Sequence, residues 1–358
     1  MDSGSPREQN PTDPITVVVT GAAGAVGSRV VRRLVRDHEG VDVRAVDRVA
    51  VGARPGLDVK QVDLAADDLA AVFAGADSVV HLATVVAPDV ADPSADELEL
   101  AIVSRVLDAA AEVGVRHVVV LSTAMVYGAW VGNPVPLTEA AEVRPNPDFP
   151  WATTRAAVER AVLEWGSGRD ASVSVLRPTA VVTNDTLGQL ARVLHTARIG
   201  IAAVGDPPVQ YLHVDDLASA ITVAVAERFD GVANVAPDGW IPPDALADLE
   251  GPQPRVRVPA WAARAAAALR GRAGLRPIPP GVVPYTSHSW VVANDRMRDL
   301  GWQADYSNEE AWVVSHDPNP LEQLPARRRQ ELALAVAAAL GLGLVVGAVV
   351  FVRRLRRR

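Results

Sequence analysis

The sequence predicts an α/β protein built on a doubly wound parallel sheet, and two observations lead to this prediction. Short β-branched runs alternate with helical patterns through the first half of the chain, which is typical of a parallel sheet covered by helices on both faces. Glycine also returns three times at the turn after the first run. With 358 residues, 49% of them hydrophobic, the chain is long enough for one large α/β domain or two smaller ones.

The first strand is predicted at Ile15–Thr20, and a glycine turn follows it at Gly21, Gly24 and Gly27. An apolar helical pattern then begins near Val26. This order binds the pyrophosphate of a dinucleotide, because glycines admit the phosphates and a helix start offers N–H groups and a positive dipole end. The spacing G-x-x-G-x-x-G therefore predicts a Rossmann-type cofactor loop, and a plain strand-to-helix turn is the alternative.

The remaining elements follow from the same patterns. Further strands are expected at Val41–Asp47, 59–64, 78–83, 117–122, 172–176, 210–214 and Gly231–Val235. Helices are expected at 67–73, 97–113, 153–165, 188–196, 215–226 and 260–271. The last helix is interpreted as an ordinary surface helix, with a lid or a helix on lipid headgroups as alternatives.

Asp47 ends the second strand about twenty residues after the glycine turn. A carboxylate at this place accepts hydrogen bonds from the adenosine ribose, which favours NAD over NADP. Arg48 follows directly and could meet a 2′-phosphate, so NADP stays open. The alternative interpretation makes Asp47 an exposed turn residue.

Composition narrows the function classes. A net charge of −8 argues against a nucleic-acid partner. The chain has no cysteine, which excludes disulfides and thiolate catalysis, and no His, Asp and Glu cluster has the spacing of metal ligands, so no metal site is expected. Lys60 is the only lysine.

Both ends of the chain differ from the middle. Residues 1–14 are polar and lack the apolar segment of a signal peptide, so a flexible tail is expected. Residues 332–352 carry no charge and are long enough to cross a bilayer. We therefore expect a single-pass C-terminal anchor in the cell membrane, and a buried helix is the alternative. Arginines flank both sides, so their charge does not orient the span.

The expected organisation has six parts. They are a tail at 1–14, an NAD(P)-binding domain at 15–182, a mainly substrate-binding portion with sheet-completing strands at 183–315, a linker at 316–331, the span at 332–352 and a basic tail at 353–358. The predicted cofactor places the main domain in the cytoplasm. Gly343 and Gly347 put small residues on one face of the span, so a homodimer is one open expectation.

Six segments in order along the chain resemble one family, the extended short-chain dehydrogenase/reductases, which include NAD-dependent epimerases and dehydratases of nucleotide sugars. The segments are TGAAGAVG at 20–27, Asp63, HLA at 81–83, STAMVYG at 122–128, LRP at 176–178 and HVDDLA at 213–218. The resemblance covers Ile15 to about Ser315 and leaves the tail and the span outside.

The resemblance implies a cofactor site and a small-molecule substrate. The implied cofactor residues are Gly21, Ala23, Gly24, Ala25, Val26, Gly27, Asp47, Arg48, Asp63, Leu64, Leu82, Ala83 and Arg155. His81 to Ala83 would line the path to the nicotinamide, and the chain from Gly188 onward would help to form the sugar-nucleotide site. The resemblance places Thr123 where the family has its catalytic Ser or Thr. His213 to Asp216 is interpreted as a helix start, capped by Asp215 or Asp216.

The resemblance fails at the catalytic pair. The family uses a Tyr four residues before a Lys on one helix face, where the Lys lowers the pKa of the Tyr and the Tyr transfers a proton. Here Trp151 stands in the Tyr position and Arg155 in the Lys position. An indole N–H donates a hydrogen bond but does not titrate usefully. Arg155 could still hold ribose hydroxyls, and Lys60 is expected near the adenosine end.

Three interpretations follow. The protein could bind NAD(H) and a ligand without catalysis, as a binding or scaffold protein at the membrane. It could be an epimerase or oxidoreductase with a displaced acid, for which Tyr127 is nearest in sequence and Tyr211 and Tyr285 are more remote. It could also transfer hydride through Thr123 or water, without the roughly 10²–10⁴-fold help of a general acid or base. We expect hydride transfer on a nucleotide sugar or a related envelope or lipid-linked precursor, with the binding protein as the alternative.

Overall fold

The computed structural model describes residues 15–38, 40–52, 56–85, 87, 92–184, 186–251, 255–272 and 278–316. Seven parallel strands form a central sheet in the order β11-β6-β5-β4-β1-β2-β3. Their bounds are Ile15–Thr20 (β1), Val41–Asp47 (β2), Leu57–Gln61 (β3), Ser78–His81 (β4), His117–Leu121 (β5), Ser172–Pro178 (β6) and Gly231–Val235 (β11). The predicted α/β class with a parallel, Rossmann-type sheet is confirmed.

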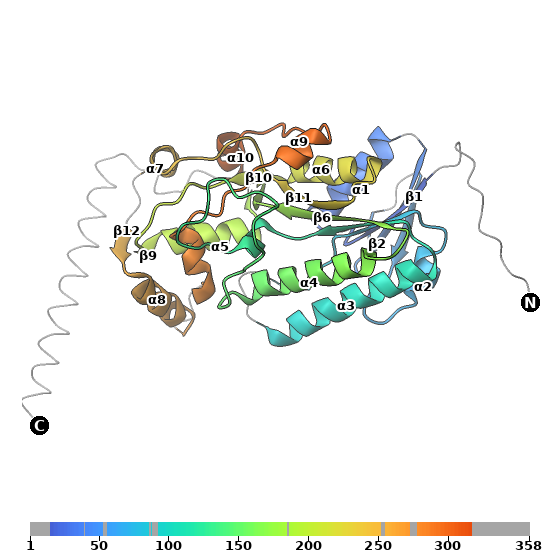
Figure 1. Ribbon diagram of the computed structural model, residues 1–358, viewed down its shortest axis with the longest axis horizontal. Coiled ribbons are helices and arrows are strands. Elements are labelled where there is room, and N and C mark those ends of the chain that lie inside the picture. The colour runs from blue at the N-terminus through green and yellow to red at the C-terminus, as the bar shows by residue number, and fades with distance from the viewer. Residues whose placement is uncertain are drawn as a thin grey trace, which may run out of the picture.

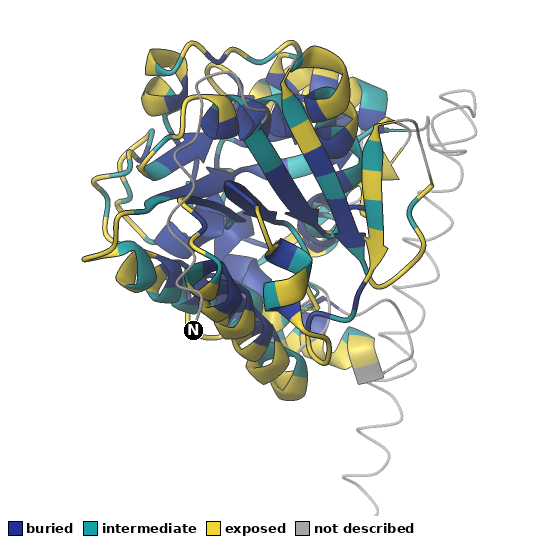
Figure 2. Cartoon of the chain, turned by 90° about the vertical axis from the view of Figure 1, so that its right-hand side faces the viewer, coloured by how far each residue is buried: buried dark blue, intermediate teal, exposed yellow. Residues whose placement is uncertain are grey.

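Helices cover both faces of this sheet (Figure 1). Helices α1 (Gly27–Asp37) and α6 (Val214–Ala226) pack on one face. Helices α2 (Leu69–Phe73), α3 (Pro93–Glu112) and α4 (Pro150–Gly166) pack on the other. Figure 2 shows the consequence, with buried strands between helices whose outer faces are exposed. Burial on both faces explains why the central strands are almost continuous runs of valine.

The second half of the chain adds two small sheets and short helices. The sheets have the orders β10-β7-β8 and β12-β9. The strands are Ala180–Thr183 (β7), Thr186–Leu187 (β8), Gly200–Ala203 (β9), Tyr211–His213 (β10) and Arg255–Val258 (β12). The helices are α5 (Gln189–Arg198), α7 (Pro243–Glu250), α8 (Ala260–Arg272), α9 (Asp295–Asp299) and α10 (Asn308–Ser315), with 3₁₀ helices η1 (Ala124–Tyr127) and η2 (Pro280–Thr286).

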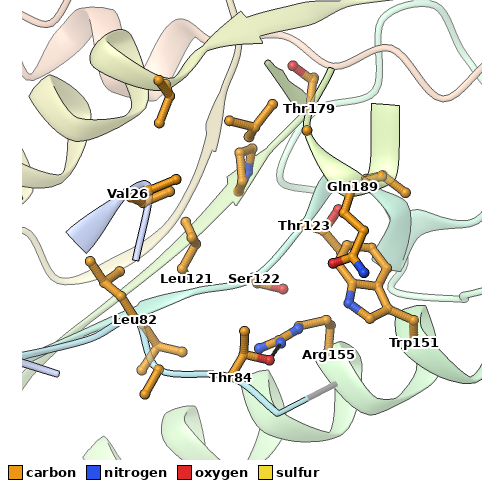
Figure 3. A pocket seen from close by; sticks show the side chains of 18 of the residues that line it. Val26, Leu82, Thr84, Leu121, Ser122, Thr123, Trp151, Arg155, Thr179 and Gln189 are labelled. Atoms are coloured by element: carbon orange, nitrogen blue, oxygen red, sulfur yellow. Dashed lines mark hydrogen bonds between the residues drawn. The ribbon is translucent and has the colours of Figure 1, made fainter. Parts of the chain in front are cut away.

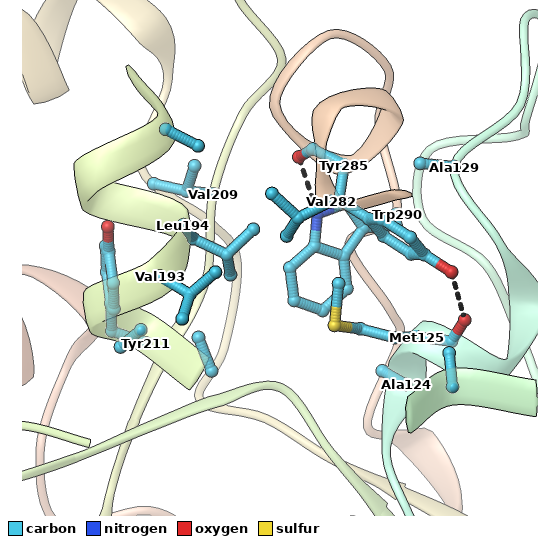
Figure 4. Close-up of a cluster of buried hydrophobic side chains, with 14 of the residues drawn as sticks. Ala124, Met125, Ala129, Val193, Leu194, Val209, Tyr211, Val282, Tyr285 and Trp290 are labelled. Atoms are coloured by element: carbon cyan, nitrogen blue, oxygen red, sulfur yellow. Dashed lines mark hydrogen bonds between the residues drawn. The ribbon is translucent and has the colours of Figure 1, made fainter. Parts of the chain in front are cut away.

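A separate apolar cluster joins this half to the central sheet (Figure 4). The Tyr285 hydroxyl in η2 donates to the Met125 carbonyl in η1 at 2.9 Å. The indole N–H of Trp290 in turn donates to the Tyr285 carbonyl at 3.1 Å. These bonds hold the segment after β5 against the C-terminal half. This contact fixes the position of Thr123, which directly precedes η1.

Several elements begin or end elsewhere than expected, and three of them show a local reason. Strand β3 ends at Gln61 and not at residue 64, because its only partner, β2, ends at Asp47 opposite Gln61. Helix α3 begins at Pro93, since the Asp92 carboxylate accepts from the N–H groups of Ser94 and Ala95. Helix α4 begins three residues early, at Pro150, where proline suits the first helical position.

The expected cap of α6 was wrong. The His213 side chain, and not Asp215 or Asp216, accepts from the Asp215 N–H at the start of that helix. Asp216 is buried and accepts from the N–H groups of Asp305 and Tyr306 instead. Burial raises the pKa of the Asp216 carboxyl to about 6.

The predicted membrane span at 332–352, with Gly343 and Gly347, lies outside the described residues, as do the tails and residues 317–331. Among the residues that the structure describes, no helix is both long and apolar enough to cross a bilayer.

Candidate functional site

The glycine turn after β1 is packed tightly against the chain that leaves β4. Gly21 has a φ of +71°, and a Cβ on it would lie 2.6 Å from the Ala83 nitrogen. A Cβ on Gly27 would collide with the Gly21 carbonyl, whereas one on Gly24 would lie 3.1 Å from it and meet nothing else. Each of the three positions therefore requires glycine for a different reason. Gly21 makes a left-handed turn, Gly24 leaves the backbone open to a ligand, and Gly27 lets the helix start approach the Gly21 carbonyl.

The start of α1 has no acidic residue of its own, and the nearby Asp215 carboxylate is paired with Arg29 at 2.8 Å. No side chain caps the helix. The turn is held by two backbone bonds, from Gly24 N–H to the Gly21 carbonyl and from Ser28 N–H to the Gly24 carbonyl, both 3.0 Å. Backbone N–H groups and the helix dipole at this place suit a pyrophosphate.

Asp47 is held beside this turn at the end of β2. Its Oδ2 accepts from the Ala23 N–H at 2.9 Å and its Oδ1 from the Val49 N–H at 3.0 Å. Both oxygens keep lone pairs for further donors, as the ribose of a dinucleotide requires. Arg48 is exposed, and its carbonyl accepts from Gln61 Nε2 at 3.0 Å.

Asp63 shapes the loop that follows β3. Its Oδ1 accepts from the Ala65 N–H at 2.9 Å, and its own N–H donates to Asp67 Oδ2 at 2.8 Å. The Leu64 side chain is buried, and its carbonyl accepts from Arg105 Nε at 3.0 Å. This loop lies next to the end of β2, since Val62 N–H donates to the Asp47 carbonyl at 2.9 Å.

A cavity of about 260 Å³ opens next to the glycine turn, beyond the carboxyl ends of β1, β4 and β5 (Figure 3). The predicted residues that line it are Ala25, Val26, His81, Leu82, Ala83, Thr123, Trp151 and Arg155, together with Gly188 and Gln189 from the segment expected at the sugar-nucleotide site. Four further lining residues with polar side chains were not predicted as site residues: Thr84, Ser122, Thr179 and Thr183. The fold therefore brings the glycine turn, Trp151 and Arg155 to one cavity.

The resemblance places Trp151 in the position of the family's proton carrier. It lies in the first turn of α4, is half-buried and faces the cavity beside Gln189 and Thr123 (Figure 3). Its ring centroid is 5.9 Å from that of Phe149 and 5.9 Å from the Arg155 guanidinium carbon. The indole thus supplies an aromatic surface and one N–H donor, with no titrating group.

Arg155 is engaged by its neighbours in α3 and after β4. Its Nη1 lies 2.9 Å from Glu99 Oε1, and its Nη2 donates to the Thr84 hydroxyl. Glu99 Oε2 also accepts from the Val85 N–H at 2.7 Å and from the Thr84 hydroxyl at 3.1 Å. The side chains are only 9% and 2% exposed, so the carboxylate neutralises the guanidinium inside the protein.

The tyrosines named as displaced acids do not line this cavity. The Tyr127 hydroxyl donates to Asn234 Oδ1 at 2.7 Å and accepts from Arg177 Nη1 at 2.8 Å. Burial raises the pKa of Tyr127 and of Tyr285, and it raises the pKa of Tyr211 to about 12. The structure therefore puts all three hydroxyls in buried, structural positions.

Two of the hydroxyl groups at the cavity, those of Thr123 and Ser122, have defined partners. Thr123 Oγ1 accepts from the Met125 N–H at 3.3 Å and caps η1. The Ser122 hydroxyl donates to Glu159, which is paired with Arg177 at 2.5 Å. Lys60 is remote, on the edge strand β3, with its Nζ 3.3 Å from Asp58.

His81 is the other titratable side chain at the cavity besides Arg155, among the described residues that line it. Its Nδ1 and the Thr20 hydroxyl share a hydrogen bond of 2.8 Å. Burial lowers its pKa to about 4, so the imidazole is neutral near pH 7.

Sequence reasoning missed Glu99 and Thr84. Thr84 directly follows the HLA segment, which was a usable signal. Glu99 carried no such signal, because it reaches Arg155 only when α3 packs on α4.

The comparisons with known proteins agree with this geometry. The family model of the NAD-dependent epimerase/dehydratase family matches residues 17–236. An uncharacterized protein of Mycobacterium tuberculosis is 28% identical over 316 residues, covering 85% of this chain and 84% of the relative.

Solved structures share the fold. MoeE5 in complex with UDP-glucuronic acid and NAD has a TM-score of 0.63 at 24% identity, and the likeness covers 84% of this chain and 97% of that one. UDP-glucose 4-epimerase of Thermus thermophilus, in complex with NAD, has a TM-score of 0.62 at 23% identity, with the same coverage. Since the family model spans more than half of the sequence, the chain belongs to the NAD-dependent epimerase/dehydratase family.

Proposed function

We propose that this protein binds NAD(H) and, beside it, a nucleotide-sugar-like ligand, and that it acts as a binding protein with little hydride transfer. One observation carries the proposal. Trp151 and an ion-paired Arg155 line the cavity at the positions of the family's Tyr and Lys, and Tyr127, Tyr211 and Tyr285 do not line it. Membership of the family and the neighbours solved with nucleotide sugars support the choice of ligand class.

The residues present fit a dinucleotide. The open backbone at Gly24 and the uncapped start of α1 suit a pyrophosphate, and the Asp47 carboxylate suits a ribose diol. When bound, NAD would supply a hydride acceptor. Asp47 favours NAD, and the exposed Arg48 makes NADP the comparison to run.

Among the described residues that line the cavity, no side chain suits the proton transfer as a Tyr beside a Lys would. General acid–base catalysis needs a group whose pKa lies near the working pH, and it contributes roughly 10²–10⁴-fold. The Trp151 indole does not titrate usefully, and an arginine stays protonated in proteins. With its pKa at about 4 and its Nδ1 bonded to Thr20, His81 is a poor donor near neutrality.

Slow hydride transfer is the second candidate, and the hydroxyls favour it. Thr123 and Ser122 both line the cavity, and Ser122 donates to the buried Glu159. A substrate hydroxyl could pass its proton to such a chain without a tyrosine. With this proton path, hydride transfer would be slower than in a relative that contains the Tyr.

The test measures binding and turnover separately on the full chain. Calorimetry with NAD⁺, NADH and NADP⁺ should show binding of NAD(H), and a UDP-sugar should bind more tightly when NAD is present. Turnover of UDP-glucose and UDP-glucuronic acid should be near background. The double variant Trp151→Tyr/Arg155→Lys should raise it by roughly 10²–10⁴-fold, whereas Trp151→Phe/Arg155→Lys should not.

A parent protein that turns over as fast as the double variant would exclude the binding role. Loss of turnover in Thr123→Val or Ser122→Ala, with NAD affinity unchanged, would favour the second candidate.

We also propose that residues 332–352 anchor the protein in the cell membrane, with the main domain in the cytoplasm. The uncharged length of this segment supports the proposal. It extends the ligand class to an envelope or lipid-linked precursor. Deletion of 332–352 should move the protein from the membrane fraction to the supernatant after an alkaline wash, and an unchanged distribution would reject the anchor.

A further inference from the structure

Helix α8 has an apolar outer face. Trp261 is 74% exposed and Leu269 is 60% exposed, and these residues lie two turns apart on the same side of the helix. Ala265 and Ala268, both exposed, complete this side. The charged residues of the helix sequence are all arginine. A helix with Trp and Leu on one face and arginine as its only charge is typical of membrane interfaces.

The two-stranded sheet beside α8 extends this surface. Ile201 in β9 is paired with Val256 in β12, so both side chains point to the same side. They are 54% and 61% exposed. The next pair on this side, Ala203 and Val258, is covered by α8 and η2 through Ala263 and Val283. Helix α8 therefore covers one end of this sheet and leaves the other open.

A second cavity connects the two parts. It measures about 310 Å³, lies between β9 and α8, and is lined mainly by Ile199, Ile201, Ala266, Ala267 and Ile278. We call Ile201, Val256, Trp261 and Leu269 the apolar face. Figure 1 shows α8, β9 and β12 together at the end of the molecule opposite to β1 and β2. The face is thus separate from the glycine turn.

The described chain ends beside α5, the helix that leads into β9. The His316 ring stacks on Trp312 at 3.7 Å and lies 5.3 Å from the His195 ring, measured between centroids. His195 is in the last turn of α5, which leads directly into β9. The fifteen residues 317–331 separate His316 from the uncharged segment. Fully extended, they span at most about 50 Å.

We propose that the apolar face rests on the bilayer interface, with Trp261 and Leu269 at the boundary between headgroups and acyl chains. The inference rests on the proposed anchor at 332–352, because the short connection limits how far the domain can be from the membrane. Arg264, half-exposed and 3.3 Å from Asp148, and Arg270, which lines the cavity, give this region a basic side chain chemistry that suits anionic headgroups. The occupant of the face is therefore lipid, which also covers the apolar side chains of β9 and β12.

The chain has no cysteine, so single-cysteine variants place one probe each. The full chain is reconstituted in vesicles of phosphatidylcholine and phosphatidylglycerol that carry a nitroxide high on the acyl chain. An environment-sensitive fluorophore is attached at Trp261→Cys or Leu269→Cys. Val131→Cys, at a residue that is 84% exposed outside the face, is the matched control.

In the vesicles, quenching by the nitroxide should be several-fold stronger at positions 261 and 269 than at position 131. In detergent without nitroxide, none of the three positions should be quenched. Ile201→Asp puts a charge on the apolar face. Added to Leu269→Cys, it should reduce the quenching of the probe at position 269, although the probe itself stays at the same place. Equal quenching at 261 and 131 in vesicles would overturn the proposal. Disulfide-linked dimers of Trp261→Cys without quenching would overturn it in favour of a second copy on the face.

Flotation of the same vesicles tests the anchor independently. Protein that floats without selective quenching would retain the anchor and reject the docked face. Protein that neither floats nor shows quenching with added vesicles would reject both.

Discussion

The Arg155 guanidinium and the Glu99 carboxylate are almost sealed from water, and this fixes what each can do. A buried ion pair gains little over an apolar pair of similar size, but loss of one partner leaves an uncompensated charge. Thr84 and the Val85 N–H satisfy further polar atoms of the pair. Arg155 is thus a structural cation that borders the cavity.

Glu99→Gln should destabilise the protein by about 3 kcal/mol, because it leaves the Arg155 charge unpaired inside the protein. The double variant Glu99→Gln/Arg155→Met should recover most of this loss. Urea unfolding followed by circular dichroism measures both free energies. If the double variant were as unstable as the single one, the pair would not be the cause.

Gly21→Ala should weaken NAD binding strongly and lower stability, since the new Cβ would be forced against the Ala83 backbone. Gly40→Ala is the matched control: Gly40 has a φ of +79° and open space around its Cβ position. The control should show only the left-handed strain, about 1–2 kcal/mol. Calorimetry with NAD and urea unfolding separate the two effects, and equal losses in both variants would contradict the packing argument.

The sequence predicted those residues of the site that follow a strand end or a glycine turn. Asp47, Ala83 and Thr123 lie at carboxyl ends of parallel strands, where the topology must bring them together. Glu99 lies on a helix, and its position depends on how α3 packs on α4. No local pattern encodes that packing, so Glu99 was found only in the structure.

At the scale of elements, η2 supports the start of α4. A Cβ on Gly281 would collide with the Asp148 carbonyl and lie 2.6 Å from the Phe149 nitrogen. These two residues directly precede α4, and Trp151 lies in its first turn. The 3₁₀ helix thus sets where the indole enters the cavity.

Gly281→Ala should cost about 1–3 kcal/mol and weaken ligand binding, because the Asp148–Phe149 backbone must shift. Gly271→Ala, in α8 with nothing near its Cβ, should be neutral or stabilising by up to about 1 kcal/mol. Thermal unfolding and ligand titration of the two variants make the comparison. Unchanged ligand affinity in Gly281→Ala would mean that η2 does not position Trp151.

Elements with strong local signals were predicted well, and those made by distant pairing were not. Strands β1, β2 and β11 have the expected bounds because each is a β-rich run limited by turns. Strands β9 and β12 were missed, since each has only four residues and they pair across more than fifty residues of sequence. The start of α3 was predictable in principle, from Asp92 followed by proline.

At the scale of the whole molecule, buried titratable groups set the response to acid. Burial lowers the pKa of His81 and His117 to about 4 each, and raises that of Asp216 to about 6. The histidines favour the folded state above pH 6.5 and lose this contribution as the pH falls toward 4. Asp216 acts in the opposite sense, because the folded state holds its proton more tightly between pH 6 and 4.

The free energy of unfolding should therefore decrease as the pH falls from 6.5 to 4. Each of the three groups contributes about 3 kcal/mol, and the loss from the two histidines exceeds the gain from the one carboxyl. Asp216→Asn should make this decrease larger by up to about 3 kcal/mol, because the variant lacks the opposing carboxyl. It should also lower the free energy of unfolding at every pH, because its hydrogen bonds to the backbone are weaker. Asp248→Asn, at an exposed position of α7, is the control. Urea unfolding at a series of pH values measures the slopes, and parallel slopes for parent and Asp216→Asn would contradict the assignment.

The Glu99–Arg155 pair also constrains how such a chain can change over generations. A lysine at position 155 would lose the planar fork that serves Glu99 and Thr84 together, so this single step is penalised before any tyrosine is present to profit from it. A tyrosine at 151 alone would gain no neighbouring ammonium. The two replacements are thus epistatic, and the buried pair opposes a change to Tyr and Lys one residue at a time.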